Sequence, residues 1–239
     1  MTKPYTSETG SKKEQVGKMF DSIAYKYDFL NHFLSMGIDK IWRNKAILKL
    51  KNKQILHLLD VATGTADVAI LATKKLKCKT TGIDLSEEML AIGKKKIEKQ
   101  KLAGSIQLML GDSENLPFEN EKFDAVTVAF GVRNFEHLDK GLNEMFRVLK
   151  SGGTIVILEF SKPQHFPFKQ IYNFYFKCIL PLIGRLVSKD TSAYTYLPES
   201  VEEFPFGSQF IKHLQDAGFN KCTYKTLTFG VSTIYTGDK

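Results

Sequence analysis

The sequence predicts an α/β protein whose doubly wound, mostly parallel sheet ends in an antiparallel edge hairpin. Short apolar runs alternate with helical patterns through the middle of the chain, as in proteins whose parallel strands are joined by helices. Two strand patterns follow each other closely at the end of the chain, and strands with so short a connection pair antiparallel. Hydrophobic residues make up 43% and charged residues 25% of the 239 residues, so we expect one globular domain over 1–239.

The first half of the predicted sheet consists of apolar runs that end in polar residues. Residues 55–62 (ILHLLDVA) form the first predicted strand and residues 78–84 (CKTTGID) the second, with a helix over 66–77 between them. Ser86 caps the next helix, which runs to Gln100 and has acids in its first turn and lysines later, as the helix dipole favours.

The second half continues the alternation and then changes direction. A helix over 137–150 is expected to stop at Gly152-Gly153, and another helix ends at Ala217-Gly218, because glycine favours the end of a helix. The remaining predicted strands are 106–111, 125–131, 154–160, 221–229 and 231–237, of which the last two form the hairpin. The sheet therefore has seven strands.

Two stretches lie outside this framework. We expect residues 1–50 to form an N-terminal helical cap and residues 163–204 to form an aromatic-rich insertion near the substrate entry. Within the insertion, residues 166–187 are mostly apolar, but Pro181 and three basic residues exclude a simple transmembrane span. This segment could belong to the core, form a homodimer contact or make an apolar entry.

The positive charge is concentrated in one half of the chain. Residues 1–110 carry 20 Lys and Arg against 11 Asp and Glu, whereas residues 111–239 carry 14 against 15. Solvated helix faces, an anionic membrane surface and a nucleic acid all remain open as explanations. The three cysteines are far apart and no His lies nearby at ligand spacing, so we expect reduced thiols and no metal. The polar N-terminus has no signal-peptide pattern, which favours the cytoplasm.

The sharpest local feature is LLDVATGTADVA at 58–69, where a buried strand ends in an acid and runs through small residues into a helix. Small residues allow a ligand to approach the backbone, and the helix N-terminus offers free N–H groups. The spacing is not GxGxxG, and no P-loop Lys follows. Asp84 ends the second strand 20 residues after Gly64, where doubly wound folds place a ribose-binding carboxylate. Asp112 and Ser113 follow the third strand at the same edge.

These strand ends resemble those of class I S-adenosylmethionine-dependent methyltransferases, which have a Rossmann-like fold. The resemblance implies that Gly64 and Thr65 face the methionine part of the cofactor, that Asp84 holds the ribose, and that Asp112 with Ser113 lies beside the adenine. Asp67 is expected to meet the methionine amino group, and the alternative is a first-turn acid that the helix dipole favours. Where many family members have glycine in the turn, this chain has Ala62 and Ala66.

A narrower resemblance covers nearly the whole chain. The stretches at 20–43, 129–135 (AFGVRNF), 146–163 and 194–200 (YTYLPES) are similar to those of the ubiquinone/menaquinone biosynthesis C-methyltransferases, although Asp39 stands where that family generally has His. GTAD at 64–67 looks more like the menaquinone branch, which implies methylation of demethylmenaquinol to menaquinol. Benzoquinol methylation in the ubiquinone branch is the alternative. A polyprenylated quinol and a peripheral contact with the inner face of the cell membrane are the partners implied.

The resemblance places the transferred methyl group near the end of the fourth strand. Arg133 is then expected to stabilise a developing phenolate and Asn134 to orient a quinol oxygen, because arginine is a good partner for a phenolate and a poor proton acceptor. Tyr27, with Tyr25 and Asn31, is expected to close over the pocket from the N-terminal helix. His137, at the start of the helix over 137–150, is a candidate proton acceptor.

Three other functions are alternatives to quinol methylation. An RNA or DNA methyltransferase would use the basic half to hold phosphates, but AFGV replaces the Asn/Asp-Pro-Pro-aromatic turn of amino methylation and no cysteine pair exists for pyrimidine attack. We therefore expect no nucleic-acid partner. A noncatalytic S-adenosylmethionine-binding protein is a second rival, and a nicotinamide dehydrogenase is disfavoured by the missing GxGxxG.

Overall fold

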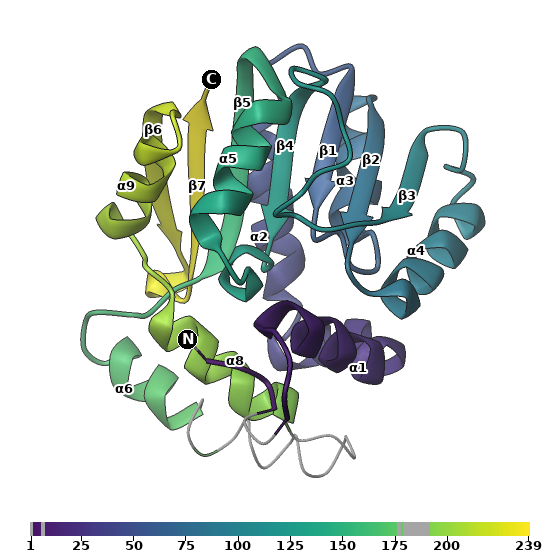
Figure 1. Cartoon of the computed structure of the whole chain (residues 1–239). Coiled ribbons are helices and arrows are strands. Elements are labelled where there is room, and N and C mark those ends of the chain that lie inside the picture. The colour runs from purple at the N-terminus through teal and green to yellow at the C-terminus, as the bar shows by residue number, and fades with distance from the viewer. Residues whose placement is uncertain (1, 6–7, 176–177, 179–191) are drawn as a thin grey trace.

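The computed structural model describes residues 2–5, 8–175, 178 and 192–239. Its centre is a seven-stranded sheet with the order β3-β2-β1-β4-β5-β7-β6, in which β1 to β5 are parallel and β7 is antiparallel to both of its neighbours (Figure 1). The strands are β1 (His57–Val61), β2 (Lys79–Asp84), β3 (Ile106–Leu110), β4 (Phe123–Ala129), β5 (Leu149–Phe160), β6 (Asn220–Leu227) and β7 (Ser232–Asp238). The predicted fold class and edge hairpin are confirmed.

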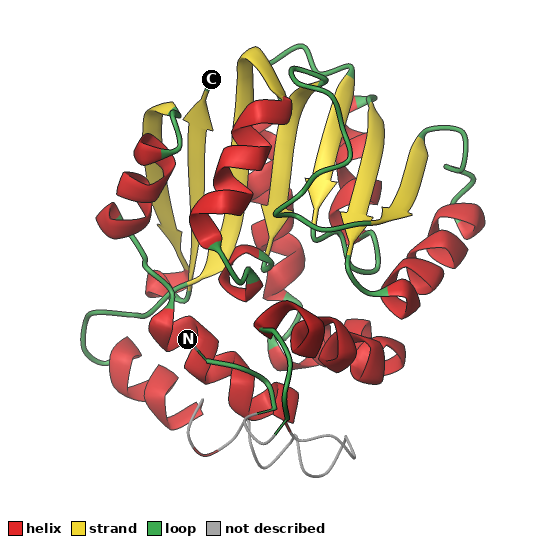
Figure 2. Cartoon of the chain, in the orientation of Figure 1, coloured by secondary structure: helices red, strands yellow, loops and turns green. Residues whose placement is uncertain are grey.

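Helices cover both faces of the sheet and its carboxyl edge (Figure 2). The helices α2, α3 and α4 pack on one face against two apolar clusters, and α5 with α9 pack on the other face against a third cluster. The helices α1 and α8 lie beyond the carboxyl ends of the parallel strands. Their bounds are α1 (Lys12–Leu34), α2 (Ile38–Ile47), α3 (Asp67–Leu76), α4 (Glu87–Lys99), α5 (Leu138–Val148), α6 (Phe168–Phe174), α8 (Ser192–Glu203) and α9 (Ser208–Asp216).

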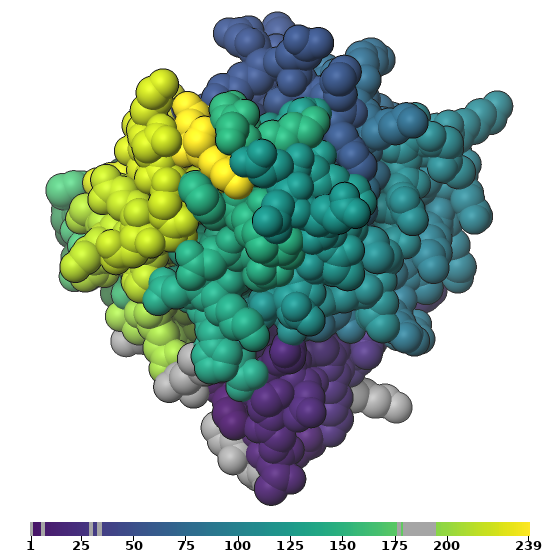
Figure 3. All heavy atoms as spheres, turned by 45° about the horizontal axis from the view of Figure 1, so that its top comes forward, coloured from purple at the N-terminus to yellow at the C-terminus, as the bar shows by residue number. Residues whose placement is uncertain are grey.

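The strand order reverses between β1 and β4, which sit side by side although β1 leads into β2. In open α/β sheets the crevice at such a reversal, outside the carboxyl ends of the strands, is where ligands bind. The helix α1 lies across this edge. In the space-filling view, the N-terminal segment, drawn in purple, forms the lower end of the molecule (Figure 3). By this rule, a ligand is expected to bind between α1 and the sheet.

Several predicted boundaries are wrong. The pair Gly152-Gly153 does not precede the fifth strand but lies inside β5, where the register to β4 shifts and Gly152 has a φ of 78°. Glycine tolerates this left-handed backbone, so the pair makes a bulge within the strand. The fourth strand begins at Phe123 and ends at Ala129, and the strand predicted to reach residue 229 ends at Leu227 because a short 3-10 turn follows.

Residues 1–50 and 163–204 each contain helices that lie at different places on the sheet or its edge. Of the helices within 1–50, α1 covers the carboxyl edge, whereas α2 packs Trp42 and Ile47 against the face of the sheet. The insertion contributes α6 and α8 at the carboxyl edge, and residues 176–177 and 179–191 lie outside the described residues. Within the described part of the chain, every helix is too short or too polar to cross a bilayer.

Candidate active site

Three adjoining cavities open at the carboxyl edge beneath α1. The first cavity, with about 700 Å³ of empty space, lies between α1 and the ends of β2, β3 and β4. The second cavity, of about 730 Å³, lies between α1, α2, α8 and the end of β5, and the third, of about 330 Å³, surrounds the turn after β1. The side chain of Tyr27 lines all three, so it marks the point where they meet.

The turn after β1 keeps a left-handed path although it contains alanines. The φ angles are 52° at Ala62, 55° at Gly64 and 66° at Ala66. An L residue in this conformation costs about 1–2 kcal/mol, so the surroundings must leave room for the two methyl groups. Glycines supply that room, because a Cβ at Gly131 would lie 2.6 Å from the Ala62 methyl group and one at Gly93 would lie 3.2 Å from that of Ala66.

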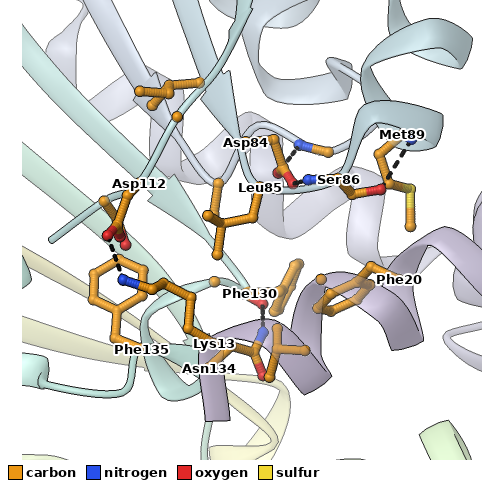
Figure 4. A pocket seen from close by; sticks show the side chains of 18 of the residues that line it. Lys13, Phe20, Asp84, Leu85, Ser86, Met89, Asp112, Phe130, Asn134 and Phe135 are labelled. Carbon is orange, nitrogen blue, oxygen red and sulfur yellow. Dashed lines mark hydrogen bonds and ion pairs between the residues drawn. The ribbon is translucent and has the colours of Figure 1, made fainter. Parts of the chain in front are cut away.

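Asp84 lies at the end of β2 as predicted, and its carboxylate lines the first cavity (Figure 4). The backbone N–H of Gly64 donates to Oδ2 at 2.7 Å and that of Ser86 to Oδ1 at 3.0 Å. Burial raises the pKa of this carboxyl, and the same two N–H groups oppose the rise. Each carboxylate oxygen retains a second lone pair, so Asp84 can still accept hydrogen bonds from a diol.

Asp112 and Ser113 also line the first cavity, and a residue of α1 contacts one of them. The ammonium of Lys13 lies 2.6 Å from Asp112 Oδ2, as Figure 4 shows. This hydrogen bond raises the pKa of Lys13. The adjacent Lys12 is buried and donates to the backbone carbonyls of Arg133 at 2.9 Å and Phe135 at 3.1 Å. The start of α1 is therefore bonded to both ends of the first cavity.

Thr65 and Asp67 line the third cavity, where they join a charged network between the four helices α1 to α4. Lys96 of α4 pairs with Asp67 and lies 3.0 Å from Asp28 of α1. The hydroxyl of Thr65 donates to Asp28 at 2.6 Å, and Arg43 Nη1 lies 3.8 Å from Asp67. The predicted residues thus lie together, and their cationic neighbours come from parts of the chain that the local motif does not include.

Asp60, at the end of the buried first strand, is a site residue that sequence reasoning did not single out. Its carboxylate lines the third cavity and accepts hydrogen bonds from Thr63 and Thr127, both at 2.6 Å. Burial raises its pKa to about 6. The acid at the end of the apolar run LLD was the available signal, because a carboxylate there faces the ligand crevice.

Arg133 and Asn134 belong to the short 3-10 helix Val132–Asn134, which follows β4 and separates the first cavity from the second. Arg133 lines the second cavity, and its Nη1 lies 2.9 Å from Oε1 of the fully buried Glu159 in β5. Burial raises the pKa of Glu159, and the charge of Arg133 opposes this. Asn134 lines the first cavity, and its amide nitrogen donates to the carbonyl of Phe130 at 3.5 Å.

The N-terminal helix contributes some of the predicted residues and not others. Tyr27 packs edge-on against Phe20 with ring centroids 5.9 Å apart, and burial raises the pKa of its phenol. Asn31 lines the second cavity and hydrogen-bonds to Tyr27. Tyr25, in contrast, is 93% exposed, so its expected place over the pocket is wrong. His137, the candidate proton acceptor, is exposed at the start of α5 and does not line any of the three cavities.

Asp39 is buried in the wall of the second cavity. It pairs with Arg43, accepts a hydrogen bond from the Ser35 hydroxyl at 2.7 Å and lies 2.8 Å from His32 Nδ1. Burial acts to raise its pKa, but these hydrogen bonds and the charge of Arg43 outweigh it, so the pKa is lowered. Among the residues that the structure describes, no group of His, Cys, Asp and Glu is arranged to hold a metal ion.

The strand order, the reversal at β1 and β4, and an acid at the end of β2 together define a class I methyltransferase fold. Solved structures with this architecture include the [4+2]-cyclase SpnF, with a TM-score of 0.72 and 17% identity over 97% of both chains. A methyltransferase from Thermotoga maritima matches with a TM-score of 0.66 and 17% identity over 93% of this chain and 99% of its own. At these identities the likeness concerns the fold alone.

Sequence comparison identifies the family. The model of the ubiE/COQ5 methyltransferase family matches residues 8–239, and the chain belongs to this family. It is 49% identical to a demethylmenaquinone methyltransferase of Bacteroides fragilis over 99% of this chain and 97% of that protein. It is 48% identical to the ubiquinone/menaquinone biosynthesis C-methyltransferase UbiE of Geotalea daltonii over 95% of this chain and 97% of that protein.

We expect Asp84→Ala to weaken S-adenosylmethionine binding by about 1.5–3 kcal/mol, because charge-assisted hydrogen bonds to the ribose are lost. Isothermal titration calorimetry on the folded variant measures this change. Asp124→Ala is the control, since Asp124 also accepts two backbone N–H groups but lies at the amino end of the sheet. Unchanged affinity in a folded Asp84→Ala protein would remove Asp84 from the binding site.

Proposed function

We propose that the protein transfers a methyl group from S-adenosylmethionine to a ring carbon of demethylmenaquinol, giving menaquinol. The observation that carries this proposal is the 49% identity to a demethylmenaquinone methyltransferase along almost the entire chain. The site supports it, because two cavities of similar size meet at Tyr27, one beside the strand-end acids and the other beside Arg133.

The residues present fit the cofactor in two parts. In the first cavity, Asp84 would accept the ribose hydroxyls, and Asp112 with Ser113 would lie beside the adenine. In the third cavity, Gly64, Thr65 and Asp67 would face the methionine part, with Asp60 close to them. Carboxylates suit the ammonium of the methionine part, and small residues suit a close backbone approach.

The second cavity fits an aromatic quinol. Its wall combines apolar side chains such as Phe20, Phe130 and Phe160 with the guanidinium of Arg133. The sulfonium supplies an already activated methyl group. The chain therefore has to hold the ring carbon in line with that methyl group and keep water out, and such positioning contributes roughly 7–11 kcal/mol.

Charge changes on the quinol define the role of Arg133. Loss of a phenolic proton to water would raise the nucleophilicity of the ring carbon. That carbon would take the methyl group, with S-adenosylhomocysteine as the leaving group, and its own proton would then pass to water, which restores aromaticity. Arg133 stabilises the negative quinol oxygen. Asn134, which we expected to orient this oxygen, instead lines the first cavity, on the cofactor side of the 3-10 turn. Tyr27 closes the junction between cofactor and substrate.

The direct test is methyl transfer from labelled S-adenosylmethionine to chemically reduced demethylmenaquinone, with the corresponding demethylated ubiquinol precursor and tRNA as competing substrates. We expect label in menaquinol and none in tRNA. Label in the benzoquinol instead would assign the chain to the ubiquinone branch. Label in tRNA alone, or cofactor binding without any transfer, would contradict the proposed function.

Arg133 calls for a conservative substitution. Because Glu159 is fully buried opposite it, Arg133→Ala would leave an unpaired buried charge at a cost of about 3–5 kcal/mol and would confuse stability with catalysis. Arg133→Lys keeps the charge but loses the planar fork, so we expect kcat to fall about 10²-fold while Tm and cofactor Kd stay close to wild type.

The control is Arg147→Lys, which alters an arginine paired with Glu144 outside the three cavities and should leave kcat unchanged. Steady-state kinetics at saturating quinol measure both variants. If Arg133→Lys keeps the wild-type kcat, the guanidinium does not stabilise the quinol oxygen.

Peripheral membrane contact is a further part of the proposal, because a polyprenylated substrate resides in a bilayer. The surface that supports it surrounds α6, where Phe166, Ile171 and Phe174 are 60–80% exposed and Lys169 is also exposed. The basic runs lie elsewhere. The lysines at 51–53 and 74–79 immediately precede β1 and β2, so they lie at the amino edge, opposite to α6.

We expect the protein to sediment with phosphatidylglycerol vesicles at low salt and less so at high salt, since salt screens the attraction between Lys169 and the anionic lipids. Ile171→Asp with Phe174→Asp should abolish binding, because each exposed apolar side chain contributes about 1.5–3 kcal/mol when buried in lipid. Lys74→Gln with Lys75→Gln should bind as wild type. Equal binding by the α6 variant would assign membrane contact to another surface.

A further inference from the structure

Two residues that line the second cavity each carry a buried polar atom without a hydrogen-bond partner among the described residues. One is Nε of Arg133, and the other is the hydroxyl of Tyr196 in α8. The rest of the wall that α8 and the start of α1 contribute here is apolar, including Met19, Ile23 and Leu197. A cavity of this kind provides an aromatic-sized slot with polar groups at a few defined points.

The position of Tyr196 is fixed by packing and not by its hydroxyl. The side chain is 3% exposed and forms one apolar cluster with Val16 and Met19 of α1. A buried hydroxyl without a hydrogen-bond partner costs free energy relative to a phenyl ring. This cost would be removed if a bound ligand supplied the partner. The electrostatic neighbours of the phenol are Arg133, Glu159 and Glu203.

The phenol of Tyr196 is suited to donate a hydrogen bond and not to act as a proton acceptor. Burial raises the pKa of Tyr196 well above its ordinary value, so the hydroxyl stays protonated at neutral pH. A protonated phenol beside an arginine stabilises an oxygen that is gaining negative charge. Two residues of the same cavity wall therefore carry a donor without a partner, one neutral and one charged.

We propose that the Tyr196 hydroxyl donates a hydrogen bond to a ring oxygen of the quinol in the second cavity, and that it thereby contributes to substrate binding and orientation. This inference rests on the proposed function. It assigns a substrate contact to α8, and it gives the unpartnered hydroxyl its partner.

Tyr196→Phe is the direct variant, because it removes only the hydroxyl. We expect kcat/KM for the quinol to fall about tenfold to hundredfold, with cofactor Kd unchanged and Tm equal to or above that of wild type. Tyr235→Phe is the matched control. Tyr235 is another buried tyrosine, but its hydroxyl accepts a hydrogen bond from the buried N–H of Gly207 at 2.9 Å. That variant should lower Tm and leave quinol kinetics unchanged.

Two substrate analogues test the contact itself. Prenylated 1-naphthols that each retain one of the two quinol hydroxyls are measured as competitive inhibitors of wild type and Tyr196→Phe. We expect the substitution to weaken inhibition by one naphthol about tenfold and to leave the other unchanged. Equal effects on both analogues, or none on either, would overturn the inference, as would a lowered Tm with unchanged quinol kinetics.

The wild-type protein in the same assay distinguishes a failure of the proposed quinol methylation from a failure of the role assigned to Tyr196. If the wild type does not methylate the quinol and neither naphthol binds it, the proposed function fails together with this inference. If the wild type methylates the quinol and Tyr196→Phe has the same kcat/KM, only the role of Tyr196 fails.

Discussion

The buried ion pair between Arg133 and Glu159 holds the arrangement of the candidate site. Glu159 is completely inaccessible near the end of β5, and the backbone N–H and guanidinium of Arg133 both point to it. A carboxylate removed from water in this way requires its partner, so the turn after β4 has little freedom. That turn forms the partition between the first and second cavities, which fixes Asn134 on one side and the arginine on the other.

The two sides of the site have different structural origins. Residues that face the first and third cavities come mostly from the ends of parallel strands, where Asp60, Asp84 and Asp112 are fixed by the sheet. The second cavity is built largely from α1, α2 and α8, which are additions to that sheet. Because many reactions share one fold, the choice of substrate is expected to reside in such additions.

Sequence reasoning located the strand-end residues because their position follows from a simple rule. A buried parallel strand that ends in a polar residue places that residue at the common carboxyl edge, and Asp84 and Asp112 obey this rule. The contacts of α1 follow no such rule. Lys12 reaches the carbonyl of Arg133, 121 positions away, and Asp28 reaches Thr65, so these contacts depend on how the helix is laid across the sheet.

The sequence also did not predict which side chains of α1 point into the cavities. Tyr25 and Tyr27 are two positions apart, and on a helix such residues point to different sides, so only one of them could line the cavity. The boundary errors have another cause. A pair of glycines is a common helix stop, but here the helix had already ended at Val148 and the glycines serve a bulge in β5.

The contact between Lys13 and Asp112 makes ligand binding a competition. Both side chains are partly exposed to solvent, and ion pairs of this kind contribute about 0.2–1 kcal/mol. A ligand group that bonds to Asp112 Oδ2 exchanges one partner for another, so its measured affinity is the difference between two contacts. Added salt weakens the existing ion pair and would make a neutral ligand bind more tightly at this end of the cavity. The first turn of α1 is then an internal competitor whose strength depends on ionic strength.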